Sequence, residues 1–271
     1  MDQPAIDPAT PFFVRKGDRL EATDAARGPW GPNSLHGRVI VGLLGAEIER
    51  LNGGPDYHPA RLTVDMYRAP QLVGLEVVTR LVRDGRRIKV VDAELLADGV
   101  SAGRATCQLL RKTDEPTGMV WTGGGNWNVP RPDTLPNFGV SPMTMNGMWD
   151  LRFISGAFDE VVQRRVWMRE TRPLIGGEPI TPFGRVAISA DYVSPLANIG
   201  NEGLQYINSD LTLYLHRVPV GEWVGYETTA HEASEGIAIG HCNIYDEAGR
   251  IGWGSVCGLA QAIQATGTPR R

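Results

Sequence analysis

The chain contains two copies of one sequence pattern, which lie about 150 residues apart. The segment LTVDMYRAP at 62–70 recurs as LTLYLHRVP at 211–219, an offset of 149 residues. A Gly-Arg-Val segment at 37–39 recurs at 184–186, and Cys107 recurs as Cys257. Several matches in one order at nearly one offset indicate a duplicated domain, because a solenoid is built from more numerous and shorter repeats.

Each copy has one segment of helical length followed by segments typical of strands. The helical segment at 37–51 is apolar on almost every side, which is typical of a buried helix, and its counterpart is 184–193. Short turns such as Asp84-Gly85 separate the strands, so the strands are predicted to form antiparallel hairpins. The expected strands are 61–68, 74–82, 88–96 and 102–110 in the first copy, and 206–217, 223–231, 237–245 and 251–259 in the second.

This pattern predicts an α+β fold in which an antiparallel sheet wraps around one buried helix, twice in tandem. The N-terminal domain is expected to span 1–118 and the C-terminal domain 159–271. A Gly- and Pro-rich connection, 119–158, lies between them. Its tryptophans, Trp121, Trp127 and Trp149, are expected to attach it to the surface.

Charge and composition exclude several classes of function. The chain of 271 residues has 27 Lys and Arg against 31 Asp and Glu, with no basic stripe, so no nucleic-acid partner is expected. The basic run 80–89 contains an Asp-Gly turn and is interpreted as a solvated hairpin tip. The N-terminus is acidic and unlike a signal peptide, and the longest apolar run, 39–46, is too short to span a membrane. A cytoplasmic protein without a membrane partner is therefore expected.

The second helical segment contains one carboxylate, Asp191, among apolar residues. An unpaired buried carboxylate is costly, so Asp191 must have partners or a raised pKa. The first copy has Leu44 at the aligned position, so the helix itself does not require an acid there. Asp191 is either a general base that activates water or a structural Asp bonded to nearby backbone, for example near Pro195.

Other polar residues precede or lie on the predicted strands. By the two-residue strand period, Asn208 and Asp210 share one face, which is either a solvent face or part of a site. Cys257, which matches Cys107, is interpreted as a small packing residue or, alternatively, a nucleophile.

Three other patterns do not predict a site. The segment GVSAG at 99–103 matches the nucleophile-elbow motif, but a hairpin turn and a strand are expected there in place of a strand and a helix. The glycine run 123–125 lacks the Lys of a phosphate loop. The five His residues have no metal-binding spacing, so no metal is expected.

The segments that narrow the interpretation are ADY at 190–192, INSDLT at 207–212, HRVPVGEW at 216–223 and YDEAGR at 245–250. Together they resemble the C-terminal half of the acyl-CoA thioesterase II-like family, which has a double hot-dog fold. Leu35-His36-Gly37 is similar to that family's N-terminal half.

The resemblance implies hydrolysis of an acyl-CoA to a free acid and CoA, without a metal or redox cofactor. In that family a helix Asp, a strand hydroxyl residue and a last-strand Gln hold the attacking water. These positions fall on Asp191, Asn208 and Cys257. His36 and Gly37 are expected to bind substrate, with backbone N–H groups at the helix start polarising the thioester carbonyl.

Two hypotheses follow: the first takes acyl-CoA as the substrate, and the second takes acyl-CoA or another acyl ligand as the bound molecule. The first is a thioesterase with Asp191 as the base, which is favoured because the acid is kept where the other copy has Leu44. The second is a hot-dog protein that binds an acyl ligand without hydrolysing it, favoured by Cys257, since Cys is a poor substitute for Gln. No segment matches a hydratase. A homo-oligomer is a further expectation, because sheet faces remain exposed.

Overall fold

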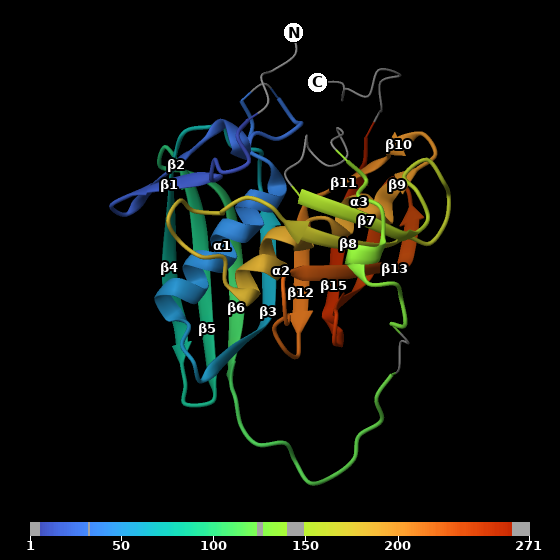
Figure 1. Ribbon diagram of the computed structural model, residues 1–271. Coiled ribbons are helices and arrows are strands. Elements are labelled where there is room, and N and C mark those ends of the chain that lie inside the picture. The colour runs from blue at the N-terminus through green and yellow to red at the C-terminus, as the bar shows by residue number, and fades with distance from the viewer. Residues whose placement is uncertain (1–5, 32, 124–126, 140–148, 262–271) are drawn as a thin grey trace.

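The computed structural model describes residues 6–31, 33–123, 127–139 and 149–261. It contains a 13-stranded sheet in the order β1-β2-β4-β5-β6-β3-β12-β15-β14-β13-β8-β7, with β11 also paired to β15. Figure 1 shows the helices α1 and α2 side by side on one face of this sheet. The sheet wrapped around one buried helix in each copy confirms the expected α+β architecture.

The first half of the sheet comes from the N-terminal copy, and each predicted strand is present with slightly shifted ends. Two short N-terminal strands were not expected. The elements are β1 (Phe13–Lys16), β2 (Arg19–Ala22), α1 (Gly37–Asn52), β3 (Tyr57–Met66), β4 (Gly74–Asp84), β5 (Ile88–Ala97) and β6 (Val100–Arg111).

The second half comes from the C-terminal copy. Its elements are β7 (Trp149–Ser155), β8 (Arg165–Glu170), α2 (Pro182–Ala190), α3 (Val193–Asn198), β11 (Tyr206–Asn208), β12 (Asp210–Leu215), β13 (Trp223–Ser234), β14 (Ile237–Asp246) and β15 (Gly249–Ala260). A separate two-stranded sheet pairs β9 (Ile199–Gly200) with β10 (Gly203–Leu204).

The two copies meet at β3 and β12, the strands that carry the clearest sequence repeat. They pair antiparallel, and Thr63 lies opposite Thr212, its own repeat partner. On either side of this pair, Leu62 pairs with Leu213 and Val64 pairs with Leu211. Leu213 is the repeat counterpart of Val64 and Leu211 is that of Leu62, so the two pairs are related by exchange of the copies. The Thr63 and Thr212 hydroxyls are 3.3 Å apart. The duplication is therefore a pseudo-twofold in space, with its axis between these two threonines.

The helices of the two copies pack closely because small residues line the contact. A Cβ at Gly42 would lie 2.8 Å from Ile188, and a Cβ at Gly45 would lie 2.9 Å from the Ala187 Cβ. Any larger residue would push the helices apart. The domain-to-domain contact is consequently as tight as a protein core.

The expected second helix, 184–193, is divided into α2 and α3. Pro195 has no N–H to donate to the Asp191 carbonyl, which instead accepts from Ser194 N–H at 3.1 Å. Asp191 thus lies at the end of α2, where it has right-handed helical dihedral angles.

The connection between the copies differs from its expectation. Trp127 does attach it to the sheet, because its ring stacks on Tyr245 with centroids 3.9 Å apart. Trp121 is instead 88% exposed. Trp149 is buried in β7, which lies inside the expected connection, 119–158, and pairs with β8 of the C-terminal copy.

Candidate functional site

Asp191 lies between the two copies. It is 8% exposed, and its carboxylate lies against the start of α1, where a Cβ on Gly37 would be only 2.9 Å from Asp191 Oδ2. Only glycine leaves room for the acid at this position. The acid comes from the second copy and the helix start from the first, so the site requires both.

Asn208 is the hydrogen-bond donor to this acid. Its Nδ2 donates to Asp191 Oδ1 at 2.9 Å and to the Asp210 carbonyl at 3.2 Å. The amide therefore orients the carboxylate from the sheet side.

A β-bulge turns Asn208 toward the helices. Asn208 pairs with Gly258 but Thr212 pairs with Ser255, so four steps along one segment oppose three along β15. The extra residue reverses the face of Asn208 relative to Asp210. The expectation that Asn208 and Asp210 share one face was wrong, because it assumed an uninterrupted strand.

Asp210 bonds to the backbone of β15. Its Oδ1 accepts from the Cys257 N–H at 2.6 Å, which ties the carboxylate to β15 beside the bulge. Burial raises the pKa of Asp210, and the Cys257 N–H opposes this. Asp210 therefore holds the bulge that directs Asn208.

His36 caps the start of α1 through a ring nitrogen. The Arg38 N–H donates to His36 Nδ1 at 3.1 Å, and the same nitrogen is 3.8 Å from Asp191 Oδ2. Burial, with the nearby Arg38 charge, lowers the pKa of His36 to about 3. The ring is accordingly neutral, with Nδ1 as an acceptor and the proton on Nε2.

The helix start supplies a backbone donor. The Arg38 and Val39 N–H groups both bond to His36, through Nδ1 and the carbonyl oxygen respectively. The Gly37 N–H has no acceptor within the helix, as is usual for the first residue. It lies beside the acid at the positive end of the helix dipole, where negative charge is favoured.

Arg38 is a buried cation that the sequence analysis missed. Its side chain is 2% exposed, pairs with Glu170 of β8, and lies over the Trp149 ring at 4.1 Å. The sequence does contain a sign of this buried cation, because Arg38 directly precedes the apolar run of a helix expected to be buried.

The pKa of Asp191 reflects its burial and two neighbouring residues. Burial raises it, while the Asn208 hydrogen bond and the Arg38 charge lower it. A carboxylate shifted toward neutral pH is better matched to proton transfer than an exposed one. The arrangement can therefore hold a water and accept its proton.

Cys257 does not join this group, so its expected place at the site was wrong. Along β15 the neighbouring residues Val256 and Gly258 are buried, whereas Cys257 is exposed and points to the opposite face of the sheet. Burial of part of the side chain and the nearby Asp210 carboxylate raise the pKa of its thiol. The inward residue opposite Asn208 is Gly258, which has no side chain to offer.

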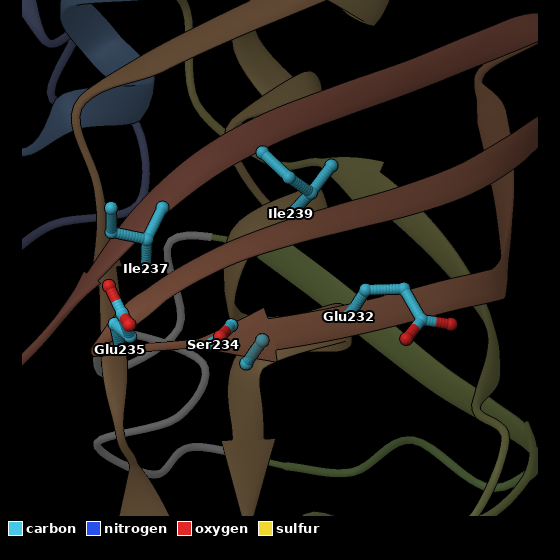
Figure 2. Close-up of a pocket in the computed structure, with 6 residues that line it drawn as sticks. Glu232, Ser234, Glu235, Ile237 and Ile239 are labelled. Atoms are coloured by element: carbon cyan, nitrogen blue, oxygen red, sulfur yellow. The ribbon is translucent and has the colours of Figure 1, made fainter.

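Two depressions of the surface lie away from this group. Figure 2 shows one at the β13–β14 turn, bordered by Glu232, Ile237 and Ile239. A second lies beside Arg86, Arg87 and Arg111. Neither contains a candidate residue, and within residues 6–31, 33–123, 127–139 and 149–261 no cluster of three or more His, Cys, Asp or Glu is placed to hold a metal.

Comparison with family models matches both copies. Residues 26–110 match the acyl-CoA thioesterase N-terminal domain, and residues 127–252 match the acyl-CoA thioesterase C-terminal domain. The second match includes Asp191 and Asn208 and ends before Cys257.

Solved structures share the architecture at low sequence identity. A hot-dog protein of unknown function from Alicyclobacillus acidocaldarius is 14% identical with a TM-score of 0.74, and the alignment covers 93% of this chain and 96% of that one. An acyl-CoA thioesterase II from Mycobacterium marinum is 15% identical with a TM-score of 0.61, over 92% of this chain and 95% of that one. These similarities show the double hot-dog fold.

Comparison with curated proteins found no match. Among the described helices, none is long and apolar enough to cross a membrane. Because its two halves match the two domains of one family in the same order and share that fold, the chain belongs to the acyl-CoA thioesterase II-like family of double hot-dog proteins.

Proposed function

We propose that this protein hydrolyses an acyl-CoA thioester to a free acid and CoA, with Asp191 as the general base. The observation that carries the proposal is the placement of a buried carboxylate against a helix N-terminus, 2.9 Å from an oriented amide. Membership in a thioesterase family supports the choice of a thioester as the substrate.

In the proposed reaction a water molecule lies between Asp191 and the thioester carbonyl. Asn208 holds Asp191 Oδ1, which leaves Oδ2 on the side of Gly37 to accept a proton from the water. The oxygen attacks the carbonyl carbon, and the Gly37 N–H stabilises the oxyanion. The intermediate collapses with cleavage of the C–S bond, and the proton on Asp191 passes to the CoA sulfur.

His36 contributes as a neutral donor. Its Nδ1 is occupied by the Arg38 N–H, so the proton on Nε2 is available to a carbonyl or phosphate oxygen of the substrate. Because its pKa is lowered to about 3, this donor stays in one form across the neutral pH range.

The second candidate function is binding of an acyl ligand without hydrolysis. It is favoured by β15, where Gly258 faces Asn208 and Cys257 points away, so that this strand gives the site no polar side chain. With only Asp191 and Asn208 to hold the water, the water would be less well oriented than with a third ligand.

The test is release of CoA from short-, medium- and long-chain acyl-CoA thioesters by the wild-type protein and by Asp191→Asn. Asparagine keeps the size and the contact with Gly37 but cannot accept the proton. We expect hydrolysis by the wild type and a loss of about 10²-fold or more in kcat in the variant. A blank without substrate corrects for the three thiols of the protein.

Two outcomes would contradict the proposal. Unchanged hydrolysis by Asp191→Asn would exclude Asp191 as the base. No release across the panel, with acyl-CoA raising the Tm of the wild type, would establish the binding protein instead.

A further inference from the structure

Arg38 carries a guanidinium that the proposed reaction leaves without a role. It is the second residue of α1, and its side chain is fully enclosed at 2% exposure. The cation lies 4.1 Å from the Trp149 ring centroid and 5.2 Å from that of Phe12, and it pairs with Glu170.

This position is unfavourable for a cation in two respects. The positive end of a helix dipole repels it, and burial removes its hydration. Burial lowers the pKa of Arg38 to about 9, so the side chain is still charged at neutral pH. The nitrogens Nε and Nη1 have no hydrogen-bond partner in the part of the chain that the structure describes. Pairing with Glu170 alone therefore accounts poorly for an arginine here.

The carboxylate of Asp191 lies beside the same turn of helix. It is 3.8 Å from His36 Nδ1 and against Gly37, the two residues that precede Arg38. Trp149 lies against the Arg38 guanidinium and makes a T-shaped contact with Tyr192, the residue after Asp191, with ring centroids 5.2 Å apart. The geometry places the cation and the base on one enclosed surface.

The other groups around the base carry no charge that could replace Arg38. From α1 the neighbour is His36, which is neutral because burial lowers its pKa to about 3, and from β11 it is the Asn208 amide. Tyr192 and, on β13, Tyr226 are buried with raised pKa values and are neutral. Around Arg38 itself, Glu170 of β8 is the paired anion and Arg172 adds repulsion.

We propose that Arg38 is a positioning residue for Asp191: its buried cation keeps the base ionised in a site that would otherwise favour the neutral acid. Arg38 does not contact the substrate in this role. The inference rests on the proposed function only in that it takes Asp191 as the base of that reaction.

The experiment measures ionisation of Asp191 directly, by NMR titration of the protein labelled with ¹³C at the Asp carboxyl. Asp191→Asn identifies the resonance. The test variant is Arg38→Met, which removes the charge and keeps much of the length. The matched control is Glu170→Gln, which breaks the same ion pair and keeps the cation.

The two variants are expected to differ in direction. Without the cation, the pKa of Asp191 rises by about 1 pH unit or more. The apparent pKa of the acid limb in the pH profile of kcat/KM rises by the same amount. Without the Glu170 anion, the local potential becomes more positive, so the pKa of Asp191 falls or stays unchanged. Arg38→Lys restores most of the wild-type value.

An equal upward change in both variants would mean that Arg38 and Glu170 only join the two copies, and would overturn the inference. An unchanged titration in folded Arg38→Met would do the same. If Arg38→Met does not fold, the double variant Arg38→Met with Glu170→Met removes both buried charges, and its Asp191 must titrate at a higher pH than in Glu170→Gln. The titration needs no turnover. It therefore tests the effect of Arg38 on Asp191 even if the protein does not hydrolyse acyl-CoA.

Discussion

Replacement of Gly37 by alanine is the most direct test of the geometry of the site. The added Cβ would lie 2.9 Å from Asp191 Oδ2 and 3.4 Å from Oδ1. Because unbonded carbon and oxygen atoms do not approach below 3 Å, the carboxylate must retreat by about 0.5 Å. The backbone of Gly37 is helical, so alanine introduces no strain of its own.

The effects on activity and on stability can be separated. Retreat of the carboxylate weakens the hydrogen bond from Asn208, which is worth about 1.5–3 kcal/mol for a charged acceptor. Alanine in place of glycine in a helix returns about 1 kcal/mol or less. The free energy of unfolding therefore falls by only about 1 kcal/mol. Misplacement of the base lowers kcat/KM by about 10- to 100-fold.

The assay is CoA release in parallel with thermal unfolding. Gly31→Ala is the matched control, since its Cβ would lie 3.9 Å from the Ser34 hydroxyl in open contact, and it should change neither quantity. If Gly37→Ala keeps kcat/KM within about twofold of the wild type, the carboxylate does not act from the position described, and the reasoning fails.

Two further predictions concern Cys257 and His36. Cys257→Ser leaves kcat/KM and Tm unchanged, because the thiol faces away from the site; a large loss in the CoA-release assay would return Cys257 to the mechanism. The pKa of His36 is lowered to about 3 in the folded protein, below its ordinary value of about 6.5. As pH falls between these values, His36 binds a proton in the unfolded chain but not in the folded protein, so the free energy of unfolding decreases. His36→Asn keeps a capping acceptor but cannot titrate, so denaturant titrations of this variant should lose that part of the pH dependence.

The fold could be predicted from the sequence because its strongest signals are periodic. The repeat located both helices and every central strand, and the turns fixed their antiparallel order. β7 was missed because its sequence follows a Gly- and Pro-rich segment that dominates the local composition. The limits of the two domains remain a prediction.

The site could be predicted only in part. The structure brings together four of the predicted residues, namely Asp191, Asn208, His36 and Gly37. They could be predicted because an acid in an apolar helix and a glycine at a helix start are visible in the sequence. The outward face of Cys257 was missed because the repeat matched it to Cys107, which is buried, whereas Cys257 is exposed. The bulge before Asp210, which turns Asn208 inward, could not be predicted from the sequence either. A bulge is a property of strand pairing and leaves little trace in one strand.

The pseudo-twofold between Thr63 and Thr212 has a consequence for how the protein can change over evolutionary time. In a symmetric dimer of identical halves, every substitution is made twice, so an acid and a leucine could not occupy equivalent positions. Fusion into one chain allows Asp191 in one half and Leu44 in the other. One half then presents a helix start and the other carries the buried acid that lies against it. The consequence is that the proposed site forms only when both halves are present.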